Sequence, residues 1–124
     1  CDILIPAARP GAIHAGNAES IKARLMLEGA NIPARPEIEA LLHTRQVLVV
    51  PDFIANAGGV ICASVEYHGG SEAQAMETIA AKINHNTNAV LRMTRVQQTT
   101  PRQAAYILAR ERVRDAMATR RTFG

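Results

Sequence analysis

The sequence predicts an α/β fold, with about three parallel strands joined by crossover helices and followed by two C-terminal helices. Three short apolar runs each lead directly into a loop that is rich in glycine, alanine or proline. Helical patterns lie between these runs, and strands separated by helices are typical of right-handed βαβ units. The length of 124 residues suits one domain.

The first two strands are expected close to the N-terminus. Residues 2–5 form an apolar run that ends at Pro6, because proline has no amide hydrogen to donate to a strand ladder. After a loop, Asn17 is a potential N-cap for a short helix over residues 18–23. Residues 25–27 form the second apolar run, which stops at Gly29.

A helix and the third strand follow. Pro36 suits the first helical position, where the missing amide hydrogen would have no partner in any case. The helix is expected to end near Arg45, and its apolar residues Ile38, Leu41 and Leu42 share one face. Residues 47–50 form a continuous, valine-rich run, which is typical of a parallel strand that is covered on both faces.

Three further helices are expected after the third strand. The first runs from near Gly58 to about Tyr67. Ser71 and Gln74 form a capping box for a long second helix that reaches about Arg95. Its inward face is predicted to contain Met76, Ile79, Ala80, Ile83, Thr87 and Val90. A second capping box, Thr100-Pro101-Arg102-Gln103, starts the last helix, which is expected to end near Met117.

Composition excludes several classes of protein. A hydrophobic fraction of 48% argues against intrinsic disorder. No apolar run approaches the ~20 residues that a membrane span needs. Cys1 and Cys62 are far apart and have no framework spacing, so we expect no disulfide scaffold and a cytoplasmic location. The chain opens on a strand without an initiator methionine, and we expect it to be part of a longer chain.

The C-terminal part of the chain is strongly basic. Residues 92–121 contain two acidic residues and eight arginines, which are Arg92, Arg95, Arg102, Arg110, Arg112, Arg114, Arg120 and Arg121. Such a stretch is one signature of nucleic-acid binding. Tyr106 is the one aromatic residue in this stretch, which gives no series of aromatic side chains for base stacking, so a solvated helix face is the favoured interpretation and no nucleic-acid partner is expected.

Two asparagines mark the candidate site. In an open α/β sheet, ligands bind just past the carboxyl ends of the strands. Asn31 follows the second predicted strand and Asn56 follows the third. An amide side chain offers both a donor and an acceptor, which suits a ribose hydroxyl or a carboxamide. Asparagine also stabilises turns, and that alternative remains open at this point.

Other recognisable sites are absent from the sequence. Gly58-Gly59 lets the backbone approach a ligand at a helix start, but the chain has no GxGxxG and no phosphate-binding loop motif. The histidines have no metal-ligand spacing, so no metal site is expected and a structural or surface role is favoured for each. They are His14, His43, His68 and His85.

Four strings resemble a known family. They are CDILIPAA at 1–8, EGAN at 28–31, VLVVPDFIANAGGV at 47–60 and AAYILARERVRDAM at 104–117. Together they are similar to the C-terminal part of the glutamate/leucine/phenylalanine/valine dehydrogenases, over nearly the whole chain. The resemblance implies a partial Rossmann-like domain, with residues 1–124 as the C-terminal half of a dinucleotide-binding domain and its C-terminal helices. It also implies a homo-oligomer that uses NAD or NADP to deaminate an L-amino acid to a 2-oxo acid and ammonia.

The resemblance also implies roles for particular residues. The cofactor contacts would be Ala7, Ala8, Gly29, Ala30, Asn31 and Asn56. Val60 and Ala63 would line the amino-acid side-chain pocket. The glutamate enzymes of the family have a serine that matches Ala63, whereas Ser64 lies one step on, turned by about 100° on a helix. Glutamate specificity is therefore in question.

No catalytic residue is predicted in this chain. In the family, the catalytic lysine and aspartate precede the part that this chain resembles. The glycine-rich dinucleotide turn of the family precedes that part as well. We therefore expect the 124 residues to be inactive alone. The alternatives are a non-catalytic binding or assembly module derived from the same half-sheet, and a nucleic-acid binder that uses the arginine-rich end.

Overall fold

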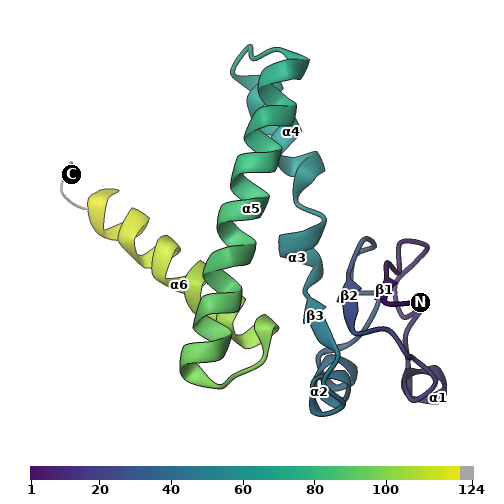
Figure 1. Cartoon of the computed structure of the whole chain (residues 1–124). Helices are drawn as coiled ribbons and strands as arrows, with labels where there is room; N and C mark the ends of the chain where they lie inside the picture. Colours follow the sequence, from purple (N-terminus) through teal and green to yellow (C-terminus); the bar gives the residue numbers. More distant parts are fainter. Residues whose placement is uncertain (121–124) are drawn as a thin grey trace.

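A computed structural model describes residues 1–120 and contains one parallel sheet. Its strands are β1 (Ile3–Leu4), β2 (Leu25–Leu27) and β3 (Leu48–Val50), in the order β1-β2-β3. In the register, Leu4 lies opposite Met26, and Met26 lies opposite Val49. The predicted α/β fold with about three parallel strands is confirmed (Figure 1).

The short helix after β1 differs from the prediction. It is α1, Ala15–Ala18, and its N-cap is His14 rather than Asn17. The His14 ring accepts a hydrogen bond from Gly16 N, and Asn17 Oδ1 accepts one from His14 N, so the two side chains form a reciprocal cap. A helix over 18–23 was therefore a wrong expectation, because Asn17 serves as the third helical residue and not as the cap.

The helix between β2 and β3 begins and ends close to its predicted bounds. It is α2, Pro36–Thr44, with proline at the first position and no side-chain hydrogen bond from Arg35 at the N-cap. Leu42 on α2 is fully buried with Met26 and Val49 of the sheet. This small core of aliphatic side chains fixes the sheet, and with it the ends of the strands.

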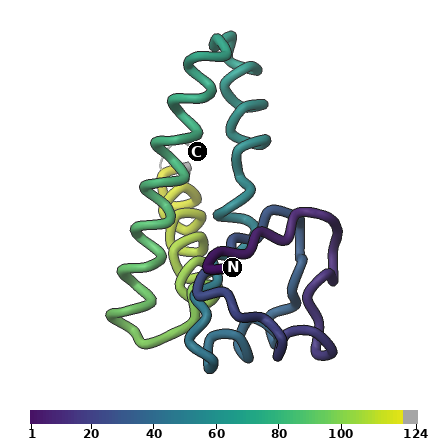
Figure 2. Tube along the Cα trace, turned by 45° about the vertical axis from the view of Figure 1, so that its right-hand side comes forward, coloured from purple at the N-terminus to yellow at the C-terminus, as the bar shows by residue number. Residues whose placement is uncertain are grey.

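The C-terminal half is helical. It contains α3 (Asp52–Ala55), α4 (Gly58–Tyr67), α5 (Glu72–Gln97) and α6 (Pro101–Arg120). In Figure 1, α3 continues the line of β3, and the α4–α5 hairpin extends away from the sheet. Figure 2 shows α6 rising beside α5 from the turn that joins the two helices. The Ser71–Gln74 capping box is present at the start of α5, as predicted.

A second core joins α5 and α6 to α3. Val90, Ala104 and Ala105 are buried there, with Phe53, Ile54, Met93 and Leu108 packed against them. The predicted inward face of α5 is wrong at its start, where Met76 is 63% exposed and its neighbour Ala75 is buried. Ala80 is exposed as well. At the start of α5, the buried face is thus rotated from the one that the apolar pattern indicated, whereas Val90 is buried as predicted.

Helix α4 keeps no buried residue. Val60 and Tyr67 on it are among the most exposed large apolar side chains of residues 1–120. Within the same residues, no helix has the length and apolar character required to cross a membrane.

Candidate functional site

The loops that follow the three strands are tied together at one edge of the sheet. Ala30 N, after β2, donates to Pro6 O, after β1, at 2.9 Å. Glu28 N donates to the carbonyl of Val50, the last residue of β3, at 3.2 Å. The predicted cofactor residues of the first two loops, Ala7, Ala8, Gly29 and Ala30, therefore lie in neighbouring segments.

Asn31 and Asn56 are in direct contact. Asn56 Nδ2 donates to Asn31 Oδ1 at 2.7 Å and also lies 3.5 Å from the carbonyl of Gly29. This contact uses the donor of one amide and the acceptor of the other. Within residues 1–120, Asn31 Nδ2 and Asn56 Oδ1 have no hydrogen-bond partner. The pair therefore offers one donor and one acceptor, side by side, at the strand ends.

Gly29 allows the first two loops to approach each other. A Cβ atom at this position would lie 3.0 Å from the Cβ atom of Ala7 and 3.3 Å from Cγ2 of Ile5. Contacts this short are tighter than most Cβ contacts in proteins, so Ala7 and Ile5 would have to give by a few tenths of an ångström. The close approach of the two loops therefore favours glycine at position 29.

A buried charge cluster lies beneath these loops. Arg102 on α6 donates from Nε to Glu39 Oε1 at 2.7 Å, and from Nη2 to Glu28 Oε2 at 3.1 Å and Asp52 Oδ1 at 3.0 Å. All four side chains are buried. One guanidinium therefore faces three carboxylates, and it also lies over the ring of Phe53, 5.4 Å from the centroid.

The carboxylates of this cluster do not share the same protonation behaviour. Burial, followed by the nearby charge of Glu39, raises the pKa of Glu28 from 4.5 to about 7. Burial opposes ionisation of Asp52 too, but hydrogen bonds from the amides of Ile32 and Phe53 and from Arg102 outweigh it, so the pKa of Asp52 is lowered. The pKa of Arg102 is raised, because its bonds to Glu39 and Asp52 outweigh its burial.

The cluster also holds backbone groups of the loops. Glu28 Oε2 accepts from Asp52 N at 2.9 Å, and Asp52 Oδ2 accepts from Ile32 N at 2.9 Å. Glu28 Oε1 is buried and has no hydrogen-bond partner among the described residues. An unpaired buried carboxylate oxygen disfavours the charged form, in agreement with the raised pKa of this residue.

Sequence reasoning missed this cluster. A usable signal was present, because Glu28 and Asp52 each follow a buried strand, where an acidic side chain needs a partner. The sequence does not indicate which of the arginines supplies it. A solvated face was the favoured interpretation of the arginine-rich stretch, and for Arg102 it was wrong.

The other arginines of the last helix behave differently from Arg102. Arg110, Arg112 and Arg114 are exposed, and Arg112 donates to Asn86 Oδ1 on α5 at 2.9 Å. The side chain of Arg120 and the whole of Arg121 lie outside the described residues. The expectation of a solvated face is confirmed for the three arginines at 110, 112 and 114.

The predicted substrate-pocket residues lie on α4, the helix that begins two residues after Asn56. Val60 is 78% exposed on α4, and Ala63, one turn further along the same helix, is exposed as well. Their spacing of three residues places them on one face. Cys1 and Cys62 are free thiols. Residues 1–120 contain no group of three or more His, Cys, Asp or Glu that could hold a metal ion.

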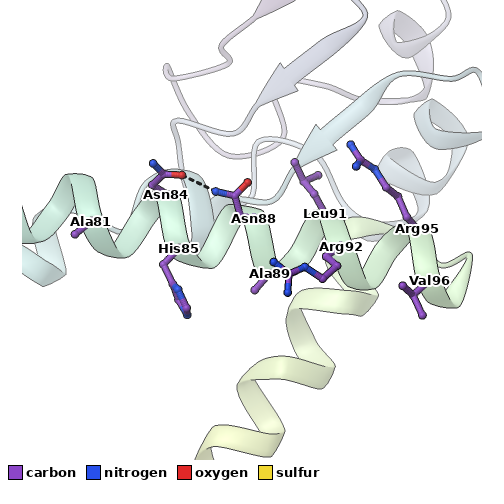
Figure 3. A pocket seen from close by; sticks show the side chains of 9 residues that line it. All are labelled: Ala81, Asn84, His85, Asn88, Ala89, Leu91, Arg92, Arg95 and Val96. Atoms are coloured by element: carbon purple, nitrogen blue, oxygen red, sulfur yellow. Dashed lines mark hydrogen bonds between the residues drawn. The ribbon is translucent and has the colours of Figure 1, made fainter.

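A hollow of about 790 Å³ runs along α5, lined by polar and apolar side chains of that helix alone. Figure 3 shows Asn84 bonded to Asn88 on one side, and His85 and Arg92 on the other. None of the predicted cofactor or substrate residues lines it. The hollow therefore belongs to the surface of the α5 helix and not to the strand-end site.

Comparison with known sequences finds one family. The profile of the glutamate/leucine/phenylalanine/valine dehydrogenases matches residues 1–121. Over 97% of its length, the chain is 43% identical to a glutamate dehydrogenase of Thermotoga maritima, of which it covers 30%. It is 38% identical over 96% of its length to an NADP(+)-dependent glutamate dehydrogenase of Pyrobaculum calidifontis, and covers 30% of that protein. It is 34% identical over 94% of its length to an NAD-specific glutamate dehydrogenase of Staphylococcus aureus, again covering 30%.

The solved structures that resemble this chain include amino-acid dehydrogenases. An L-tryptophan dehydrogenase from Nostoc punctiforme superposes with a TM-score of 0.84 at 26% identity, over 92% of this chain and 35% of that one. A hetero-hexameric glutamate dehydrogenase from Thermus thermophilus, in a leucine-bound form, superposes with a TM-score of 0.81 at 29% identity. The superposition covers 96% of this chain and 30% of that one. The chain thus spans about a third of the length of the proteins that it matches.

Proposed function

This chain belongs to the glutamate/leucine/phenylalanine/valine dehydrogenase family, and on that basis we propose that it supplies the nicotinamide side of the cofactor site in an NAD(P)-dependent amino-acid dehydrogenase. Such an enzyme converts an L-amino acid to a 2-oxo acid and ammonia, and catalyses the reverse reaction. The observation that carries the proposal is the Asn31–Asn56 pair at the carboxyl ends of neighbouring parallel strands.

The residues at the strand ends fit a nicotinamide group. A carboxamide presents one acceptor and one donor, and these match Asn31 Nδ2 and Asn56 Oδ1. Ala7, Ala8, Gly29 and Ala30 carry at most a methyl group, so that a flat ring could lie against their backbone. When bound, the oxidised cofactor supplies a hydride acceptor for the amino-acid substrate.

Residues of α4 would contact the amino-acid substrate. We propose that Val60 and Ala63 form one wall of the amino-acid side-chain pocket, because they share a face of α4 and are exposed. Ala63 has no hydroxyl group, and Ser64 is turned away by about 100°. The chain therefore offers no hydroxyl at this position for the distal carboxylate of glutamate.

The rest of the enzyme would come from other parts of a longer protein. We assign residues 1–124 to the C-terminal half of a dinucleotide-binding domain, since the chain covers 30% of its curated relatives. The catalytic lysine and aspartate implied by the family would lie outside it. A homo-oligomer is the proposed assembly.

The alternative is a role restricted to assembly. Strand β1 lies at an edge of the sheet, and Ile3 and Ile5 are both more than half exposed there. An exposed edge can pair with another strand. This alternative predicts no dinucleotide binding, so the titration described next distinguishes it from the proposed function.

The test is a calorimetric titration with NAD⁺ and NADP⁺ of the protein that carries this chain. Gly29→Ala should weaken binding about 10-fold, or ~1.4 kcal/mol, because the new Cβ would lie 3.0 Å from Ala7. Ala40→Ser is the matched control, since it adds one small group to an exposed position of α2 that carries no predicted site residue. Equal affinities for the two variants would argue against the site. In a separate assay, the 124 residues alone should show no amino-acid-dependent reduction of either cofactor.

A further inference from the structure

Both asparagines of the site are positioned through Asp52. The side chain of Asp52 accepts a hydrogen bond from the amide of Ile32, the residue after Asn31, at 2.9 Å. The backbone carbonyl of Asp52 accepts one from the amide of Asn56 at 2.8 Å. Any shift of Asp52 would therefore move both members of the Asn31–Asn56 pair.

The turn next to Asn31 is strained. Ile32 has a φ of 49°, which is a left-handed conformation that a β-branched residue rarely adopts. Its side chain is 54% exposed, so packing does not enforce this conformation. Two hydrogen bonds do so, one from Ile32 N to Asp52 Oδ2 and one from Gly11 N to Ile32 O, both 2.9 Å long.

Arg102 holds Asp52 from the opposite side. Its Nη2 donates to Asp52 Oδ1, and the same nitrogen donates to Glu28 Oε2, which also accepts from Asp52 N. Both the amide and the carboxylate of Asp52 are thereby fixed with respect to α6. The planar guanidinium, anchored by Glu39 and lying over Phe53, can hold this geometry in a way that a lysine ammonium cannot.

We propose that Arg102 is a positioning residue for the Asn31–Asn56 pair, acting through Asp52 to maintain the left-handed turn at Ile32. The inference rests on the proposed function where it concerns the cofactor. Arg102 lies on the last helix, far from the asparagines in sequence, and contacts neither of them. Through Arg102 and Asp52, helix α6, which carries no predicted cofactor residue, influences the cofactor site.

The first test measures hydrogen exchange by mass spectrometry in Arg102→Lys, in the protein that carries this chain. Lysine keeps the positive charge but loses the fork that contacts Glu39 and Asp52 together. We expect exchange in residues 28–34 and 52–57 to become at least ~10-fold faster, while residues 61–67 of α4 change little. Arg112→Lys is the control, because Arg112 ties the same helix to Asn86 of α5, and it should leave residues 28–34 unchanged.

A rescue variant tests the role of the strained turn. Asparagine adopts the left-handed region more readily than isoleucine, so Ile32→Asn should slow the exchange of residues 28–34, corrected for intrinsic rates. In the Arg102→Lys background it should recover most of the lost protection. If Arg102→Lys does not fold, the single variant Ile32→Asn still tests the strained turn, because it retains the buried charge cluster.

Cofactor affinity provides a readout that a purely structural role would not change. If the wild-type protein binds NAD⁺ or NADP⁺, Arg102→Lys should weaken binding and Ile32→Asn should restore it. If the wild-type protein binds neither, the proposed function fails, and the exchange data still decide the role of Arg102. Equal acceleration of all segments, an effect of Arg112→Lys as large as that of Arg102→Lys, or no rescue by Ile32→Asn would each overturn the proposal.

Discussion

At the scale of single residues, the cluster around Arg102 decides how the strand ends are held. Three carboxylates share one guanidinium, so the cluster carries excess negative charge when all of them are ionised. Burial makes that excess unfavourable. Glu28 relieves it by binding a proton more tightly, and its pKa is raised to about 7.

The raised pKa of Glu28 predicts how the unfolding free energy depends on pH. The folded state holds this proton more tightly than the unfolded state, for which the pKa is near 4.5. The unfolding free energy should therefore fall as pH rises from about 4.5 to 7, by up to ~3 kcal/mol. The lowered pKa of Asp52 acts outside this window, where stability is lost as pH falls below 3.8.

Glu28→Gln should flatten this dependence. The glutamine side chain is neutral at every pH and keeps an oxygen that can accept from Asp52 N. Urea unfolding at pH 5 and at pH 8 should show a smaller loss for the variant than for the wild type. Glu37→Gln removes the same formal charge from an exposed position of α2 and should retain the wild-type profile. A wild-type slope in Glu28→Gln would refute the assignment.

At the scale of elements, two small cores support the site. Met26 of β2 is fully buried against α2, and it holds the strand that leads to Glu28 and Asn31. Val90 of α5 packs with Ala104 and Ala105 of α6, and this contact places Arg102 beneath the strand ends. The low aromatic content of 3% leaves both cores mainly to aliphatic side chains.

Two methionine variants test which side chains are buried in these cores. Met26→Ala should lower the unfolding free energy by about 2–5 kcal/mol, because it creates a cavity in the sheet core. Met76→Ala removes the same atoms from a side chain that is 63% exposed and should change it by no more than ~0.5 kcal/mol. Chemical denaturation of the two variants provides the comparison. Similar losses would show that Met76 is buried, as the apolar pattern of α5 had indicated.

At the scale of the whole molecule, the sequence predicted much of the fold, because its signals are local. Apolar runs that end in glycine or proline locate the strands, and proline or a capping box locates the starts of α2, α5 and α6. The start of α1 was missed, since His14 is an unusual N-cap and Asn17 a common one. The face of α5 depends on where α4 lies, which the sequence of α5 does not specify.

The site was predictable only in part for the same reason. Asn31 and Asn56 are recognisable because each follows a strand, and parallel strands bring their carboxyl ends together. The partner of Glu28 and Asp52 comes from α6, about 50 residues or more away along the chain. Such a pairing depends on tertiary structure, and several arginines of the same stretch were equally plausible partners.

Mapping of the cofactor by nuclear magnetic resonance tests the central claim most directly. The side-chain amides of Asn31 and Asn56, together with the backbone amides of Ala7 and Ala30, should shift when NAD⁺ or NADP⁺ is titrated into the isotopically labelled protein. The amides of residues 84–96, along the α5 hollow, should remain unchanged. Shifts confined to α5 or to the exposed arginines of α6, with none at the two asparagines, would contradict a nicotinamide site at the strand ends.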